Sequence, residues 1–551
     1  MKENIKLLGL SVLINAILFS LSIAFFTPTF EASDDIRMML LSKGVCVSNI
    51  GTELILFSSV FYGKYLSFFS NLFSSINFYT WNYLFLFFVS HGLLLFILLK
   101  KHTKRANAII CFLTYYIFFS LSSFLKMQFT VLCALIACIS LIALDMALVR
   151  KNYKYLTVAI LFYLFSLLIR KEMAIIIGIL SLPFFAYRVF ILRDVKKLSF
   201  FIVVAVIAYT GLNTFDASYY KLKSYDFHQT HPFIATVFVD YYLIDKISPE
   251  QRQKLKKEYN WNENDIRLYK SWFIKNTEVF DKTKFDFAKI KPLVWGYILS
   301  KSLSPSFEFI MELGNFAYFR IASFFLVILF VFNWDKKIKL CVLSIAIGLT
   351  TVFLLYFLSA LKFVPFRVLF SVAIFFASFI FYSIPNKIII NKKIQYAVCL
   401  LTLFLGYRMV LLNLKVSSIN QQEISETREL INSLDTNRIY ISWGNAIPWD
   451  GINPFDNLNS LKKLNVFSLA SGSDHPAILQ KYPMFKNNFL KEICSNPKVN
   501  FLVKTDGIRK KQEILNTYFK DHFNQSISFK DTFIKKIGNN ISVSGFSIEK
   551  L

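Results

Sequence analysis

Long apolar runs alternate with short polar loops along most of this chain. A run of about 20 apolar residues is long enough to cross the hydrocarbon core of a bilayer as a helix. The pattern therefore predicts a polytopic α-helical membrane protein with about 11 transmembrane helices. The predicted spans are 5–26, 81–99, 108–122, 129–148, 156–170, 173–190, 199–215, 316–333, 341–358, 366–383 and 394–413. The first run is too long for a signal-peptide core and no small-residue cleavage site follows it, so we expect a retained first helix.

Lysine and arginine cluster in every second loop between these runs. The clusters lie at 100–105, 150–154, 188–197, 336–339 and 387–393. Because loops rich in Lys and Arg stay in the cytoplasm, we expect these loops and the N-terminus to be cytoplasmic and the other loops to lie outside. The net charge of +27 is then explained by the loops, and no nucleic-acid partner is expected.

The apolar stretch 54–78 does not fit this alternation. A lysine and several serines interrupt it, and counting it as a span would move every later basic loop outside. We therefore expect an interfacial helix or helix pair lying on the outer surface. The first external loop then covers 27–80. A second large external loop covers 216–291, and Ser248-Pro249-Glu250 starts a helix within it.

Beyond about residue 415 the periodicity becomes that of a soluble domain. Helices are expected at 423–434 and 509–519, and strands at 438–443, 499–504 and 541–548. This mixture predicts a small α/β domain. We divide the chain into a transmembrane domain, 1–414, and an extracytoplasmic α/β domain, 415–551.

Three carboxylates, Glu31, Asp34 and Asp35, directly follow the first apolar run. Ionisable groups are costly beside an apolar core, so such a cluster is a candidate general base or a candidate ligand of a metal or phosphate. The alternative is that the two aspartates cap a helix beginning near Ile36, where carboxylates satisfy free amides and the helix dipole. The residue pattern leaves both readings open.

Basic residues are sparse in the external turns, and the few present are candidate phosphate ligands. Arginine can place two N–H groups on two phosphate oxygens, which suits it to hold a phosphate. The alternative is that the side chain snorkels to lipid headgroups, and we favour this alternative for Lys126 and Lys362. The residues concerned are Lys126, the trio Arg170-Lys171-Glu172, Lys362 and Arg367.

Other chemical motifs are weak in this sequence. His228 and His231 have a spacing that suits a metal, but no third ligand is near in the sequence, so we predict no metal site there. The sequence contains no GxGxxG, Walker, HExxH, GxSxG or CxxC pattern. ATP-driven transport and zinc proteolysis are therefore unsupported.

One stretch carries a family resemblance. The first-loop sequence Asp34-Asp35-Ile36-Arg37-Met38-Met39-Leu40-Leu41-Ser42-Lys43-Gly44 is followed by Gly63-Lys64-Tyr65-Leu66 and Trp81, and later by 261–265 and 362–367. With the architecture above, it resembles the C-superfamily of integral membrane glycosyltransferases. It is most similar to bacterial members that modify O-antigen, a part of lipopolysaccharide, or other surface polysaccharides.

The resemblance implies a hexosyltransferase of the bacterial cytoplasmic membrane. Such enzymes take a monosaccharide from a polyprenyl-phosphate carrier on the outer side and transfer it, with inversion, to a lipid-linked glycan acceptor. A first-loop carboxylate is the base, here Asp34 or Asp35, with a slight preference for Asp35. Arg170, Lys171 and Arg367 would bind the phosphate, and the substrate site would also include Glu31, Lys126, Glu172 and Lys362.

Two questions stay open: which residue is the base, and whether a rival function fits the sequence. Many family members carry Asp-x-Asp or Glu-x-Asp where this chain has Asp-Asp, so the identity of the base and the need for a divalent metal stay open; no other cofactor is expected. The rival functions are a polysaccharide polymerase, which usually relies on two mid-chain loops, and a flippase or transporter for a lipid-linked sugar, which predicts mid-membrane polar residues and an internal repeat.

Overall fold

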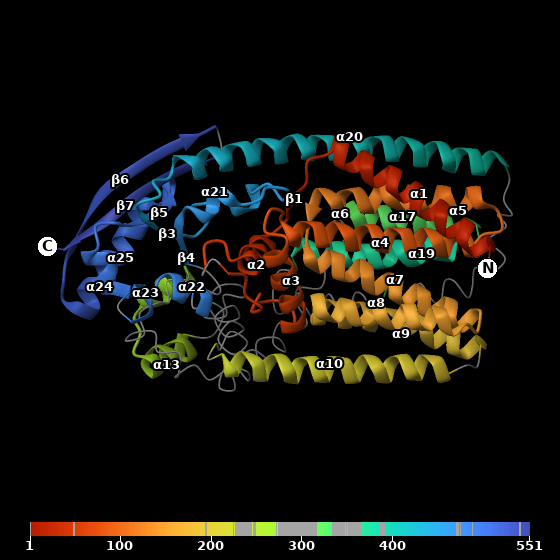
Figure 1. Ribbon diagram of the computed structural model, residues 1–551, viewed down its shortest axis with the longest axis horizontal. Coiled ribbons are helices and arrows are strands. Elements are labelled where there is room, and N and C mark those ends of the chain that lie inside the picture. Colours follow the sequence, from red (N-terminus) through yellow and green to blue (C-terminus); the bar gives the residue numbers. More distant parts are fainter. Residues whose placement is uncertain are drawn as a thin grey trace.

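The chain folds into a long helical bundle with a mixed α/β domain at one end (Figure 1). This computed structural model describes residues 2–47, 50–192, 195–223, 225, 245, 249–271, 273, 317–332, 348, 350, 365–384, 392–469, 473, 475–487, 489–538 and 541–550. Of the predicted span 341–358, only positions 348 and 350 are described. The candidate residues His228, His231 and Lys362 lie outside the described ranges.

The bundle is built from long apolar helices that match the predicted runs. They are α1 Lys2–Phe25, α4 Phe78–Lys101, α5 Arg105–Tyr115 with its continuation to Leu125, α7 Phe129–Val149, α8 Tyr153–Ile169, α9 Lys171–Leu192, α10 Lys196–Leu222, α17 Ala317–Phe332, α19 Phe366–Ser383 and α20 Lys392–Ser433. Within the described ranges, eight helices are long and apolar enough to cross a membrane, and α8 and α17 are shorter apolar helices. The chain is therefore a multi-pass membrane protein.

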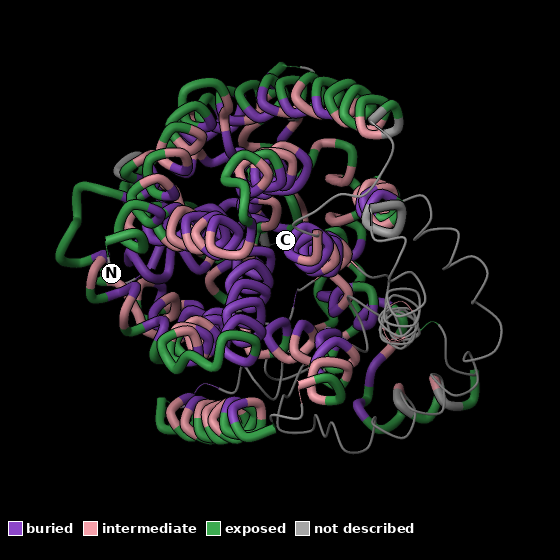
Figure 2. Tube along the Cα trace, turned by 90° about the vertical axis from the view of Figure 1, so that its right-hand side faces the viewer, coloured by how far each residue is buried: buried purple, intermediate pink, exposed green. Residues whose placement is uncertain are grey.

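Helix α7 forms the centre of the bundle. Its spanning segment is entirely buried and packs against α4, α8, α9 and α19. By contrast, α10 and α20 lie on opposite sides of the bundle and are largely exposed (Figures 1 and 2). Their outward apolar residues, such as Val206, Ile207, Leu400 and Phe404, are more than half exposed among the described residues. A lipid environment accounts for these surfaces.

The described basic loops meet at the end of the bundle away from the α/β domain. The Arg150 guanidinium donates to the carbonyl of Lys100 at 2.6 Å, and the Lys101 ammonium donates to the carbonyl of Ile384 at 3.3 Å. The Lys100 ammonium also contacts Asn4 near the N-terminus. This shared end agrees with the predicted alternation of basic and non-basic loops.

The first loop contains two short helices and no span. Helix α2 covers Ser33–Lys43 and α3 covers Val60–Leu72, and both lie between the bundle and the α/β domain (Figure 1). A two-residue strand β1, Thr29–Phe30, pairs in parallel with β2, Lys126–Met127. Gly63 allows α3 to pass against the carbonyl of Glu53, a place that a Cβ would occupy. The interrupted apolar stretch 54–78 thus contains one short helix, α3, and no span, while α2 precedes the stretch.

The C-terminal domain is a five-stranded mixed sheet with helices. Its strands are β3 Ile439–Trp443, β4 Asn465–Leu469, β5 Val499–Lys504, β6 Ile527–Ile537 and β7 Ile541–Lys550, in the order β4-β3-β5-β7-β6. The first three are parallel, and β7 is antiparallel to β5 and β6. Helices include α22 Pro476–Lys481, α24 Phe489–Ser495 and α25 Ile508–Phe523. The predicted α/β class is confirmed.

Part of the segment predicted to be the second external loop packs on this domain. Helix α13 covers Pro249–Tyr259 and begins at the predicted proline, and α14 covers Glu263–Lys270. The side-chain amide of Asn264 donates to the carbonyl of Ile514 at 3.0 Å, and the Trp443 indole N–H donates to the carbonyl of Ser271 at 3.0 Å. The domain core is therefore completed by residues from the middle of the chain.

Two predicted boundaries differ from the structure. Helix α10 continues to Leu222, past the predicted loop start at 216. The predicted span 394–413 and the predicted helix 423–434 are one helix, α20, so the boundary at 414/415 falls inside a continuous helix. The change from apolar to polar composition does not break it, because no glycine or proline occurs from Tyr407 to Ser433.

Candidate active site

The acidic first loop is held at the mouth of the bundle by backbone pairing. The amide of Glu31 donates to the carbonyl of Met127 at 3.0 Å, which extends the short β1–β2 pairing. Helix α2 then begins at Ser33, with Ala32 at the N-cap and no side-chain cap hydrogen bond. Asp34 and Asp35 therefore lie in the first helical turn and do not cap it, contrary to the alternative left open above, although the helix dipole still favours their charge.

Asp35 is fully buried and bound from two sides. Its Oδ1 accepts from the Tyr79 hydroxyl at 2.8 Å and from the Phe129 amide at 3.0 Å. Burial raises the pKa of the Asp35 carboxyl well above its usual range, and the hydrogen bonds from Tyr79 and Phe129 oppose that rise. Asp35 thus joins α2 to the beginnings of α4 and α7, which is a positioning role.

We expect Asp35→Ala to lower the free energy of unfolding by about 1–3 kcal/mol for each buried donor that it leaves unpaired. Asp35→Asn keeps an acceptor oxygen and matches the shape of the neutral acid, so its melting temperature should stay near that of the wild type. Thermal unfolding of both detergent-solubilised variants measures the difference. Equal losses for the two variants would contradict this role.

Asp34 points to a different environment. It faces Arg367 at the start of α19, with Oδ2 at 3.5 Å from the guanidinium, and both side chains are about one-fifth exposed. Glu31 lies beside them, and burial raises the pKa of its carboxyl against the lowering effect of Arg367. Lys126 donates to the Thr29 hydroxyl at 3.0 Å and lies 3.8 Å from Glu423 of α20. Carboxylates and cations from four distant chain segments therefore meet here.

A cavity of about 480 Å³ opens on this cluster. Its lining joins the membrane bundle to the C-terminal domain: Phe30, Glu31, Lys126, Phe366, Glu423, Glu426, Thr427, Pro448, Asp450 and Gly451. Asp450 is accessible to solvent, yet its partial enclosure, reinforced by the charge of Glu31, raises the pKa of its carboxyl to about 6, while Lys126 opposes the rise. No sequence pattern marks Asp450 or Glu423 as site residues, because both lie in the polar C-terminal region.

The raised pKa of Asp450 predicts a pH effect on stability. The unfolded chain releases this proton near pH 4, whereas the folded chain releases it near pH 6, so this group makes folding less favourable as pH rises across that interval. We expect Asp450→Asn to remove this contribution. The melting temperature of the variant should therefore fall less than that of the wild type between pH 4 and pH 6, and identical profiles would contradict the raised pKa.

Arg170 ends α8 and lies next to the same helix starts. Its guanidinium lies 4.9 Å from the centre of the Phe129 ring and 5.6 Å from that of Phe57, and its Nε is 3.7 Å from Glu172. Its Nη1 atom is buried and has no hydrogen-bond partner among the described residues. A buried donor of this kind costs about 1–3 kcal/mol when unsatisfied, so it marks a place where an acceptor ligand would be stabilised.

Arg170 and Arg367 flank the first turn of α7. Phe129 links Arg170 to the acidic loop, because its ring contacts Arg170 and its amide binds Asp35. Ser371, one turn beyond Arg367, donates to the carbonyl of Thr130 at 3.5 Å. The structure therefore brings the two predicted phosphate-binding arginines and Asp34 to the same rim of the bundle.

Lys171 and Glu172 have other surroundings. The Lys171 ammonium lies 2.8 Å from Asp216 in a largely buried ion pair, and Asp216 also accepts from the Ser59 hydroxyl and the Val60 amide, each at 3.0 Å. Lys171 thus fixes α9 to α10 and to the start of α3. The Glu172 side chain is two-thirds exposed and contacts Arg170 from the outside.

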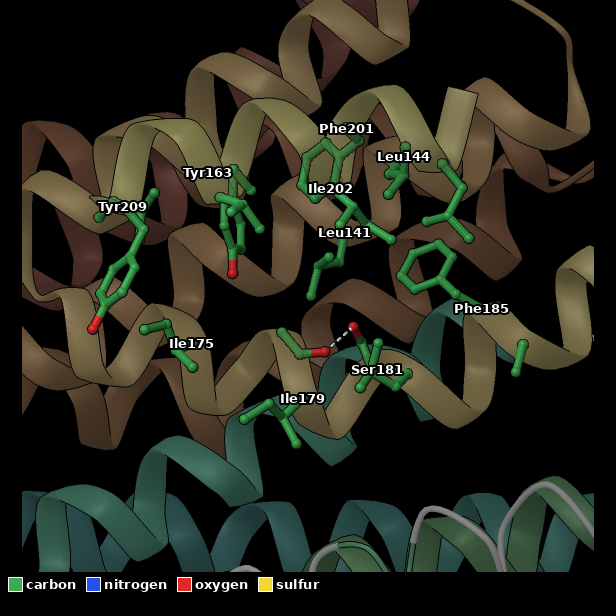
Figure 3. Close-up of a pocket in the computed structure, with 17 residues that line it drawn as sticks. Leu141, Leu144, Tyr163, Ile175, Ile179, Ser181, Phe185, Phe201, Ile202 and Tyr209 are labelled. Atoms are coloured by element: carbon green, nitrogen blue, oxygen red, sulfur yellow. Dashed lines mark hydrogen bonds between the residues drawn. The ribbon is translucent and has the colours of Figure 1, made fainter. Parts of the chain in front are cut away.

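An apolar groove runs between α7, α8, α9 and α10 (Figure 3). Its volume is about 600 Å³. Leu141, Tyr163, Ile179, Phe201 and Tyr209 are among the residues that line it, and it begins about one turn from Lys171, at Ile175. The hydroxyl of Tyr163 donates to the carbonyl of Ala174 at 3.0 Å, so the groove offers almost no free polar atom. A groove of this kind suits a hydrocarbon chain.

Taken with the membrane bundle, these features define the class: a multi-pass membrane protein with a charged site between its helices and a C-terminal α/β domain. Among the described residues, no group of three or more His, Cys, Asp or Glu side chains is placed to hold a metal ion.

No protein-family model matches the chain, and no curated protein sequence matches it. Among solved structures, it is similar to the crystal structure of ArnT from Cupriavidus metallidurans bound to undecaprenyl phosphate, with a TM-score of 0.42 and 9% identity over 98% of this chain and 97% of that chain. The apo structure of the same protein gives a TM-score of 0.42 and 10% identity over the same shares. Similarity at this level carries no conclusion about activity, so the function proposed below rests on the residues of this chain.

Proposed function

We propose that this protein is a membrane glycosyltransferase that moves a hexose from a polyprenyl-phosphate carrier to a surface-glycan acceptor. The observation that carries the proposal is the meeting of Asp34 and Arg367, at 3.5 Å, with Arg170 beside the same helix starts. Transfer from a phosphate ester needs a base for the acceptor hydroxyl and positive charge for the departing phosphate. This rim of the bundle supplies both.

In the proposed reaction, Asp34 is the base. An acceptor hydroxyl gives its proton to the Asp34 carboxylate as its oxygen attacks the anomeric carbon of the donor sugar. The bond from that carbon to the phosphate oxygen breaks on the opposite face, so configuration is inverted. The polyprenyl phosphate leaves with the bonding electrons. Asp34 is preferred over Asp35 because Asp35 is buried and already binds Tyr79 and Phe129.

The phosphate is proposed to bind between Arg170 and Arg367. The unpartnered Nη1 of Arg170 would gain a phosphate oxygen as acceptor. Arg367 would exchange part of its contact with Asp34 for the phosphate, which would free the carboxylate for the acceptor. Lys171 is proposed to hold α9 in place and not to bind the phosphate, because Asp216 already neutralises its charge. The isoprenoid chain would lie in the apolar groove along α9 and α10.

We also propose the orientation. The basic loops lie at the end opposite the α/β domain, and such loops are cytoplasmic in membrane proteins. The site and the C-terminal domain would then face outward, in a bacterial cytoplasmic membrane, with an O-antigen-like glycan as acceptor. Lys126 and Glu31 would contact the sugars.

The test compares donors. The purified full-length protein in nanodiscs is given a panel of polyprenyl-phosphate hexoses with radiolabelled sugar and a lipid-linked glycan extract from cell envelopes. We expect label to leave the carrier and enter the glycan, with release of polyprenyl phosphate. Transfer directly from nucleotide-activated hexoses, with none from the lipid donors, would contradict the proposal.

A further inference from the structure

A second cavity lies on the C-terminal domain, at the carboxyl ends of its parallel strands. The chain leaves β3 for β4, which pairs with one edge of β3, and then returns to β5, which pairs with the other edge. The carboxyl ends of the neighbouring strands β3 and β5 thus form a topological switch point. The loops after these strands diverge there, and open α/β sheets bind ligands at such a point. Residues 445–450, just after β3, and residues 504–506, at the end of β5, both line the cavity.

The cavity has a volume of about 610 Å³ and is lined by both polar and apolar residues. The side chains that matter here are Ser33, Asn445, Trp449, Asp450, Lys504 and Asp506. Its floor is ordered by hydroxyl contacts: Ser542 donates to Thr505 at 2.9 Å, and Thr505 and Ser544 share a hydrogen bond of 2.8 Å. These bonds order the hydroxyls of Thr505 and Ser542.

This cavity adjoins the proposed catalytic site. Pro448 and Asp450 line both cavities. Ser33, at the start of α2, lines the polar cavity and immediately precedes Asp34. A ligand in the polar cavity would therefore lie next to the first turn of α2, which carries the base.

We propose that this cavity binds the saccharide of the acceptor and presents its hydroxyl to Asp34. The inference rests on the proposed function and names the part of the chain that selects the acceptor.

The lining matches the chemistry of a sugar. Vicinal hydroxyls donate to carboxylates and exchange hydrogen bonds with an amide, which Asp450, Asp506 and Asn445 provide. The Trp449 indole offers a flat apolar surface for the C–H face of a pyranose ring. Two carboxylates stand against the single cation of Lys504, so the balance favours a neutral or amino sugar over a uronic acid.

The experiment measures saccharide binding by the full-length protein in nanodiscs. Saturation-transfer NMR is recorded with methyl glycosides of neutral, amino and uronic di- and trisaccharides. The test variants are Asn445→Ala and Asp506→Asn. The matched control is Asp531→Asn, an exposed aspartate on β6 that does not line the cavity. Binding of a polyprenyl phosphate without sugar is measured on every variant as a readout of the other site.

We expect neutral or amino saccharides to bind the wild type and Asp531→Asn equally, and to bind each test variant about 10-fold more weakly, as expected for losing hydrogen bonds to a polar or charged group. Polyprenyl-phosphate binding should not change. No binding by any saccharide, preferred binding of uronic acids, or equal binding by all variants would overturn the inference. If one of these outcomes occurs while polyprenyl phosphate still binds, the inference fails and the donor site stands. If the wild type neither binds polyprenyl phosphate nor turns over the lipid donor, the proposed function itself is refuted.

Discussion

Asp34→Asn is expected to lower kcat by about 10²- to 10⁴-fold, the range that a positioned general base contributes. The amide keeps the size of the side chain and its place in the first turn of α2 but cannot accept the acceptor's proton. The donor KM should change little, because Arg170 and Arg367 remain. Initial rates with a lipid-linked hexose, at saturating acceptor, measure the effect.

The matched control for this variant is Asp456→Asn. Asp456 also pairs with an arginine, Arg428, at 3.0 Å. It lines neither the cavity at Glu31 and Lys126 nor the polar cavity of the C-terminal domain. Its rate should equal that of the wild type. If Asp34→Asn retains full activity while Glu31→Gln loses it, the base has been misassigned to Asp34. If Asp35→Asn is the inactive variant at normal stability, the positioning role of Asp35 is wrong.

Arg170→Ala is expected to reduce kcat/KM for the lipid donor by about 10- to 150-fold, the loss of one charge-assisted hydrogen bond of about 1.5–3 kcal/mol. The effect should be greatest on kcat, because charge on the phosphate grows as the sugar leaves. Arg170→Lys should recover only part of the activity, since an ammonium cannot place two N–H groups on two phosphate oxygens. Steady-state kinetics with varied donor give the division between kcat and KM.

Arg150→Ala serves as the control for Arg170→Ala. Arg150 lies at the opposite end of the bundle, where its guanidinium donates to the carbonyl of Lys100. Its loss should leave donor kinetics unchanged. Wild-type kcat and KM in Arg170→Ala would rule out a role for this arginine in holding the phosphate.

Much of the fold follows from hydrophobic length and charge alone. The apolar runs and the alternation of basic loops predict the bundle. The serines and lysine within 54–78 predict a short helix or helix pair instead of a span, and the structure has one short helix there. Three of the five C-terminal strands are also predictable. Of the two missed strands, β6 carries Lys530, Asp531, Lys535 and Lys536, which hide its alternation.

The candidate site is less predictable, because it depends on long-range packing. The acidic pair is visible in sequence, but only the structure separates Asp35, buried against Tyr79 and Phe129, from Asp34, which faces Arg367. Lys171 looks like a phosphate ligand until Asp216, 45 positions later, is seen to bind it. Asp450 reaches the site from the C-terminal domain, a contact that no local pattern indicates.

The central claim is transfer of a lipid-linked sugar at the outer rim, with Asp34 as base. The most direct measurement is mass spectrometry of surface glycans and lipid-linked sugars from cells that contain equal amounts of the wild type or Asp34→Asn. The proposal predicts one added hexose in the wild type, and in the variant an unmodified glycan with the sugar retained on its carrier at the outer face. The same added hexose in the variant as in the wild type, or retention of the lipid-linked sugar at the cytoplasmic face, as a flippase would cause, would contradict it.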